Sequence, residues 1–182
     1  RSQARRHMGS SVGPSRWVGR EEEQAALRSG LDRSAAGAPT VLVVTGEAGM
    51  GKSTLLRAVV RDRDALVVTA SGDEAETELD FGVADQLLAG VPLARRPELR
   101  TGADPLEVGA TLLRVVGELP PGRPVIVVVD DAHLADLPSL TALTFAARRL
   151  RAEPVALLLA GRPEAAAAAR HRADAEGCGP RR

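Results

Sequence analysis

Aromatic residues are nearly absent from this chain of 182 residues, which contains Trp17, Phe81, Phe145 and no tyrosine. A core built without aromatic rings must consist mainly of valine, leucine and alanine. Proteins that bind single-stranded nucleic acid stack its bases on aromatic side chains, and this chain offers few of them. The composition therefore argues against a domain that reads nucleic-acid bases directly.

Cysteine, net charge and long apolar runs are also lacking. Cys178 is the only cysteine, which excludes a disulfide framework and a cysteine-rich metal cluster. The formal net charge is zero, so no overall field attracts nucleic acid or an anionic membrane. No apolar run reaches the length of a membrane span, and the first residues lack the apolar centre of a signal peptide. We therefore expect a cytoplasmic protein without a membrane partner.

The two ends of the chain differ in composition from its middle. The first 20 residues contain five arginines and no acid, and His7-Met8-Gly9-Ser10 is typical of a cloning-derived segment. We expect residues 1–16 to be a disordered or tag-derived arm, because a basic Ser/Gly-rich end is more often solvated than phosphate-bound. Residues 164–182 begin with an alanine run and end in glycine, proline and arginine, so we expect a poorly ordered tail. One domain, residues 17–163, remains.

Within that domain, helical patterns alternate with short apolar, β-branched runs. The patterns predict strands at residues 40–45, 65–70, 124–129 and 154–160, and helices at residues 20–34, 52–62, 81–89, 105–118 and 138–151. Continuous apolar strands are typical of a parallel sheet that is buried on both faces. Strands that alternate with helices form right-handed βαβ units. We therefore predict an α/β fold, a three-layer α/β/α sandwich with a mostly parallel sheet.

Lys52 is the only lysine beside 23 arginines, and it lies in a glycine-rich segment between a predicted strand and a predicted helix. The segment fits the phosphate-loop pattern G-x-x-x-x-G-K-[ST], and its residues are Gly46, Glu47, Ala48, Gly49, Met50, Gly51, Lys52, Ser53 and Thr54. Backbone N–H groups of such a loop, together with the helix dipole, bind phosphates, and a compact ammonium fits beside β- and γ-phosphates. Glycines at 46, 49 and 51 allow positive φ and let the backbone approach the phosphates closely. A plain glycine-rich turn is the alternative.

The hydroxyl of Ser53 is expected to bind Mg²⁺, and that of Thr54 to reach the α-phosphate. Asp130 and Asp131 follow the most apolar predicted strand, on the side where open α/β sheets bind ligands. Asp130 would orient the Mg²⁺ shell through water, and Asp131 would polarise a water that attacks the γ-phosphate. We place both residues on the strand, where neighbours point to opposite faces, which would separate the two roles. For Asp131 a helix N-cap or a solvated pair is the alternative.

Two further residues are candidates near this acidic pair. Arg162 follows the last predicted strand; if that strand lies between the other two, Arg162 would face the γ-phosphate and offset charge in the transition state. A surface role for Arg162 is equally open. His133 lies two residues after Asp131, and a structural histidine is the more common interpretation than a catalytic one.

Several segments together resemble the ATPase domain of large LuxR-type transcriptional regulators, which belong to the STAND branch of AAA+-like P-loop ATPases. The resemblance covers about residues 17–163 and rests on Val18-Gly19-Arg20-Glu21-Glu22-Glu23, on residues 43–53, on Gly72–Glu76, on Asp80–Leu88 and on Asp130-Asp131-Ala132-His133-Leu134-Ala135-Asp136. It implies an AAA+/STAND-like P-loop NTPase fold, truncated before the lid and output domains. It also implies that ATP or ADP and Mg²⁺ are the ligands.

The same resemblance implies roles and partners. It implies that Val18, Gly19 and Arg20 lie beside the adenine, and that Arg162 senses the γ-phosphate. The partners would be the regulator's own C-terminal domains or other copies, with DNA bound only through a helix-turn-helix absent from this sequence. Three functions stay open: a slowly hydrolysing regulatory ATPase, with Lys52, Asp131 and Arg162 as catalytic residues; a nucleotide-binding interaction module without turnover; and a small-molecule phosphotransferase.

Overall fold

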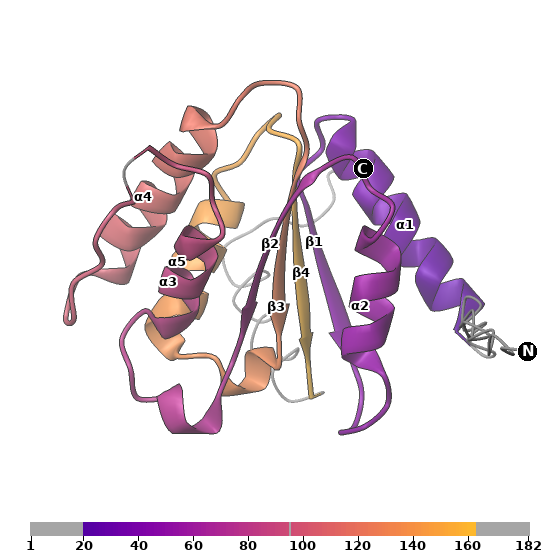
Figure 1. Ribbon diagram of the computed structural model, residues 1–182, viewed down its shortest axis with the longest axis horizontal. Helices are drawn as coiled ribbons and strands as arrows, with labels where there is room; N and C mark the ends of the chain where they lie inside the picture. The colour runs from indigo at the N-terminus through magenta and orange to yellow at the C-terminus, as the bar shows by residue number, and fades with distance from the viewer. Residues whose placement is uncertain (1–19, 95, 163–182) are drawn as a thin grey trace, which may run out of the picture.

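The computed structural model describes residues 20–94 and 96–162, in which helices and strands alternate (Figure 1). The elements are α1 (Glu21–Ala35), β1 (Thr40–Thr45), α2 (Lys52–Val60), β2 (Leu66–Ser71), the short 3₁₀ helix η1 (Glu74–Glu76), α3 (Gly82–Ala89), α4 (Pro105–Glu118), β3 (Val125–Asp130), the short 3₁₀ helix η2 (Ala132–Leu134), α5 (Leu137–Ala147) and β4 (Val155–Gly161). Each predicted boundary is confirmed to within two residues, except that α5 ends four residues before the predicted end. The predictions for residues 1–16 and 164–182 lie outside the described residues.

All four strands are parallel and form one sheet in the order β1-β4-β3-β2. The predicted parallel α/β sheet is therefore confirmed, and β4 does lie between the strand before the glycine-rich loop and the strand that ends in Asp130. The carboxyl ends align, because Thr45 pairs with Gly161 and Ser71 pairs with Asp130. Connections that leave these ends consequently meet along one edge of the sheet, at the bottom of Figure 1.

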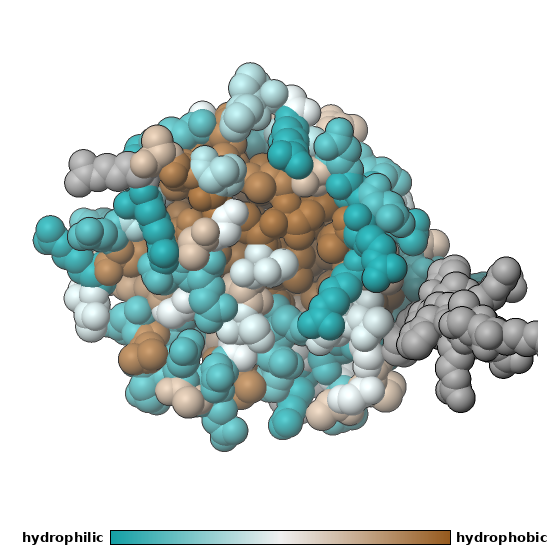
Figure 2. All heavy atoms as spheres, in the orientation of Figure 1, coloured by the Kyte–Doolittle hydropathy of each residue, from teal (hydrophilic) through white to brown (hydrophobic). Residues whose placement is uncertain are grey.

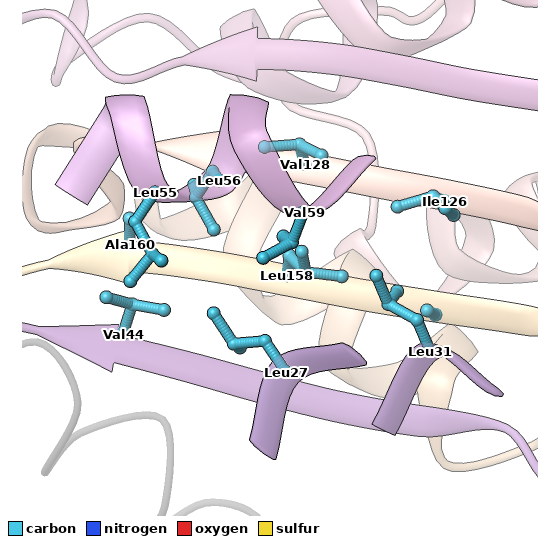
Figure 3. Packing of buried hydrophobic residues seen from close by; sticks show 11 residues of the cluster. Leu27, Leu31, Val44, Leu55, Leu56, Val59, Ile126, Val128, Leu158 and Ala160 are labelled. Atoms are coloured by element: carbon cyan, nitrogen blue, oxygen red, sulfur yellow. The ribbon is translucent and has the colours of Figure 1, made fainter. Parts of the chain in front are cut away.

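Helices cover both faces of the sheet, and side-chain alternation along the strands supplies a core on each face. On one face, α1 and α2 pack against alternate residues of β1, β4 and β3, as Figure 3 shows for Leu27, Leu55, Val59, Ile126 and Leu158. On the other face, α3 and α5 pack against the residues in between, including Val129, Leu157 and Leu159. Helix α4 forms an outer layer against α5. Among the described residues, no helix is long and apolar enough to cross a membrane.

Apolar side chains also gather on the surface along which the edge strand β2 runs, between α4 and α2 (Figures 1 and 2). Beside it, side chains of α3, α4, α5 and the sheet enclose an apolar hollow of about 80 Å³, lined among others by Val68, Leu112 and Leu143. Only apolar residues line this hollow. The polar residues singled out from the sequence lie elsewhere, at the carboxyl ends of the strands.

Candidate functional site

The glycine-rich loop connects β1 to α2, as predicted. Gly49 and Gly51 have φ values of 75° and 74°, in the left-handed region that favours glycine, and Gly51 is the N-cap of α2. Gly46 is not among the glycines with positive φ. Two left-handed residues just before a helix turn backbone N–H groups toward the loop interior, where the helix dipole adds positive potential. The loop is thereby shaped to bind an anion.

Lys52 is the first residue of α2, and its side chain folds back over the loop. Its Nζ donates to the carbonyl oxygens of Gly46 and Glu47, each at 2.9 Å, and the residue is 7% exposed. An ammonium has three N–H donors, and a buried charge is costly without an opposite charge. Within the described part of the chain, no carboxylate forms an ion pair with Lys52. Among the described residues, the charge of this buried ammonium is therefore met by the dipoles of two loop carbonyls rather than by a carboxylate.

Ser53 and Asp130 come together although they are far apart in sequence. Both line a hollow of about 320 Å³ between α2 and the carboxyl ends of β2 and β3, together with Arg57, Ser71 and Gln86. Residues 20–94 and 96–162 contain no cluster of three or more His, Cys, Asp or Glu side chains that would hold a metal by itself. Mg²⁺ needs only one or two protein oxygens when phosphates and water complete its octahedral shell. A hydroxyl and a carboxylate on one hollow fit that requirement.

Asp131 departs from the geometry expected from the sequence. Strand β3 ends at Asp130, and Asp131 is left-handed, with φ 44° and ψ 43°, so the argument from alternating strand faces was wrong for this residue. Asp131 occupies the N-cap of η2, but its side chain makes no capping hydrogen bond and is 45% exposed. The N–H of Asp131 donates to Oδ1 of Asp130 at 3.0 Å. The second carboxylate is thus presented by a tight turn rather than by a strand.

His133 lies beside that carboxylate. Its Nδ1 is 3.9 Å from Oδ1 of Asp131, and this buried nitrogen has no hydrogen-bond partner. The side chain is 16% exposed, so it packs against the turn rather than extending into solvent. A buried imidazole nitrogen next to a half-exposed carboxylate is compatible with a small adjustment that joins the two.

Arg162 directly follows β4 and is exposed. The carbonyl oxygen of the preceding residue, Gly161, accepts a hydrogen bond of 3.2 Å from the N–H of Gly46. The end of β4 is thereby joined to the first residue of the glycine-rich loop. Arg20, the N-cap of α1, has its Nη1 3.5 Å from Oε2 of Glu23, without a hydrogen bond from that nitrogen. Val18 and Gly19, expected beside the adenine, lie outside the described residues.

The residues that hold the acidic turn in place were not among the candidates predicted from the sequence. Asp136 is 2% exposed, and its carboxylate accepts hydrogen bonds from the N–H groups of Phe81, Val83 and Ser139 at 3.0, 3.0 and 2.7 Å. Ser139 is fully buried and accepts a further bond from the N–H of Ala84 at 2.9 Å. The segment Asp136-Leu137-Pro138-Ser139 carries a local signal, because aspartate before a proline is typical of a helix start. The contact of Asp136 with α3 has no such local signal in the sequence.

Comparison with known proteins supports the fold. A chain in the structure of Drosophila ORC bound to DNA matches with 19% identity and a TM-score of 0.59, over 80% of this chain and 38% of that chain. A chain in the structure of Drosophila ORC bound to AT-rich DNA and Cdc6 matches with 19% identity and a TM-score of 0.40, over 78% of this chain and 49% of that chain. This chain thus spans less than half the length of either. A comparison with curated proteins found no match.

The family model for the AAA ATPase domain matches residues 16–159, which is most of the chain. That range includes the glycine-rich loop, the paired acids and all of the sheet except the last two residues of β4. The chain belongs to the AAA ATPase domain family.

Proposed function

We propose that residues 17–163 form the ATP-binding, slowly hydrolysing domain of a LuxR-type transcriptional regulator, which acts in the cytoplasm as a nucleotide-dependent switch. The V-G-R-E segment at residues 18–21 and the D-D-A-H segment at residues 130–133 favour this branch over a generic ATPase. DNA binding would belong to a helix-turn-helix outside this sequence. Other copies of the regulator, or its own further domains, would be the protein partners.

Lys52 is the single observation that carries the proposal. Its ammonium is buried at the start of α2, bonded to two loop carbonyls and unpaired with any described carboxylate. The β- and γ-phosphates of ATP would supply the missing negative charge, while the loop N–H groups would bind the same oxygens. All nine residues from Gly46 to Thr54 would take part, with Thr54 nearest the α-phosphate.

Magnesium would supply charge compensation for the phosphates. Ser53 and Asp130 are the residues that would hold it, the hydroxyl directly and the carboxylate through water, since both line the same hollow. Asp131 would accept a proton from the attacking water. Arg162 would stabilise charge on the γ-phosphate, because the adjacent Gly161 is hydrogen-bonded to the loop.

Turnover is expected to be slow. The Asp131 side chain is 45% exposed, and water around a catalytic carboxylate weakens the electrostatic stabilisation of the transition state. A switch needs only that ATP and ADP are held differently. The module without turnover is the second candidate, and it differs from the first only in what Asp131 does.

Phosphate release by the purified chain, measured beside an Asp131→Asn variant, tests the proposal. Asparagine keeps the shape and tolerates the left-handed backbone but removes the charge. We expect ATP to bind both proteins equally and phosphate release to fall at least tenfold in the variant. Equal release would favour the module without turnover, and phosphate found on an added metabolite would favour a phosphotransferase.

Lys52→Ala is the matched binding variant. We expect it to weaken ATP binding by at least tenfold in calorimetry, because the buried ammonium is lost, while circular dichroism stays unchanged. Unchanged affinity in the folded variant would contradict a phosphate site at this loop, and with it the whole proposal.

A further inference from the structure

Gly72 is the first residue after β2, and it lies directly against the turn that presents Asp131. Its N–H donates to the carbonyl oxygen of Asp130 at 3.0 Å, which continues the ladder between β2 and β3 by one bond. A methyl group at Gly72 would lie 2.6 Å from the nitrogen of Ala135 and 2.6 Å from the carbonyl carbon of Leu134, and closer still to the carbonyl oxygen of Asp131. The absence of a side chain is what lets the two backbones touch.

The turn that Gly72 contacts has an unusual backbone. Asp131 is one of two non-glycine residues with positive φ among those described. Such a conformation persists when the surroundings determine it, and it is frequent at functional sites. Two local bonds help, from the N–H of Asp131 to Asp130 Oδ1 and from the N–H of Leu134 to the carbonyl oxygen of Asp131. They define the turn, but they do not place it relative to the sheet.

Placement comes from contacts at both ends of the segment 131–135. Gly72 packs against its backbone from the end of β2. Just beyond it, Asp136 is held by the N–H groups of Phe81 and Val83 at the start of α3. Phe81 is the other left-handed non-glycine residue and is 1% exposed. The segment is therefore fixed between β2 and α3, both remote from it in sequence.

We propose that Gly72 is a positioning residue for ATP hydrolysis, which sets the place of the Asp131 carboxylate through backbone contact without touching the nucleotide. The inference rests on the proposed role of Asp131. A methyl group at 2.6 Å is roughly 0.8 Å short of an ordinary contact of 3.4 Å, and the atoms it meets are backbone, which cannot rotate away. The turn must move by a comparable distance. Misplacement of a catalytic group by about 1 Å lowers the rate by as much as 10²-fold.

The test is Gly72→Ala in the full 182-residue chain. We expect kcat for ATP hydrolysis to fall between tenfold and about 100-fold. The Kd for ATP should stay within about twofold of the unmodified chain, because the loop from Gly46 to Thr54 is untouched. In an Asp131→Asn background the same glycine change should cause no further loss, since the group it misplaces is already inactive.

Gly109→Ala is the matched control. Its methyl group would lie 2.6 Å from the Phe145 ring and 2.8 Å from the carbonyl oxygen of Ala142, where α4 packs on α5. It makes the same chemical change in an equally tight place, away from the acidic turn. We expect lower stability but unchanged kcat for the folded protein. If both glycine variants have the same kcat, Gly72 is only structural and the inference is overturned.

A measurement without nucleotide separates this inference from the proposed function. Backbone amide NMR shifts of residues 131–135 should change in Gly72→Ala and stay in place in Gly109→Ala. If the unmodified chain releases no phosphate, the hydrolytic role of Asp131 fails, whereas the shifts still test whether Gly72 positions the turn. If Gly72→Ala does not fold, Asp136→Asn replaces it as the test, because it loosens the other end of the segment 131–135. This variant should lower kcat for ATP hydrolysis and leave the Kd for ATP unchanged. An unchanged kcat would refute the positioning of the turn.

Discussion

Replacement of Asp136 by alanine should be among the most destabilising single changes in this domain. The carboxylate is 2% exposed and accepts three backbone N–H groups, from Phe81, Val83 and Ser139, which are themselves buried residues. Each buried N–H left without an acceptor costs about 1–3 kcal/mol. Three such groups would lower the free energy of unfolding by roughly 3–9 kcal/mol, and removal of a buried charge would offset part of this loss. We expect a loss of about 4 kcal/mol, out of a total of about 5–15 kcal/mol for a typical domain.

Asp104→Ala is the control for this prediction. Asp104 also precedes a proline and caps a helix, α4, but it is exposed and accepts one N–H, that of Leu106, at 2.8 Å. Loss of an exposed N-cap costs about 1 kcal/mol. Urea unfolding followed by circular dichroism gives both free energies of unfolding. If Asp136→Ala costs no more than Asp104→Ala, the carboxylate does not hold α3 and α5 together, and the reasoning from its three hydrogen bonds is refuted.

Two further predictions follow from backbone geometry and from one shifted pKa. Gly51→Ala forces a left-handed backbone, φ 74°, on a residue with a side chain and should cost about 1–2 kcal/mol. Gly117→Ala, in the last turn of α4 where a methyl group meets nothing within 4 Å, should stabilise slightly, and urea unfolding compares the two variants. Hydrogen bonds from the backbone N–H of Arg151 and from that of Glu153 itself lower the pKa of the exposed Glu153 carboxyl. Its small stabilising effect is present above the ordinary glutamate pKa and is lost as the pH falls through the lowered one. Glu153→Gln should therefore be slightly less stable than the unmodified chain at pH 7, and the difference should shrink as the pH falls through the lowered pKa.

The order of elements could be predicted because each strand is a short, continuous apolar run and each helix has its own boundary signals. Residues 124–129 read as a buried strand from composition alone, and the observed strand, Val125–Asp130, is shifted by one residue. Pro105 gives the start of α4, where Asp104 is the N-cap. The end of α5 was placed too late, because no glycine or proline marks Ala147 and the arginines that follow are also good helix formers.

The glycine-rich loop could also be predicted, because its function depends on residues that are adjacent in sequence. Lys52 and its two carbonyl acceptors lie within seven residues, and the left-handed Gly49 and Gly51 follow from the pattern. Gly46 has no positive φ; it follows β1 directly, and its N–H donates to the carbonyl oxygen of Gly161 at the end of β4. A methyl group at Gly46 would lie 3.7 Å from Met50 Cβ and 3.9 Å from Lys52 Cδ, which are ordinary contacts, so packing within the described residues does not require glycine there.

The position of the acidic turn could be predicted from the sequence, but its backbone conformation could not, because the residues that contact it are about 60 positions away in the sequence. Two consecutive aspartates after a strand give no sign that the strand ends between them. The turn that leaves the strand at Asp131 is placed by the contact of Gly72 with residues 131–135 and by the hydrogen bonds of Asp136 to the start of α3. In the sequence, Gly72 looks like any glycine after a strand. Only the pairing of β2 with β3 places it at Asp130, so its role depends on the sheet order. A contact of this kind can be predicted only when the topology of the sheet is known. Comparing kcat for ATP hydrolysis in Gly72→Ala and Gly109→Ala measures how far the site depends on this contact.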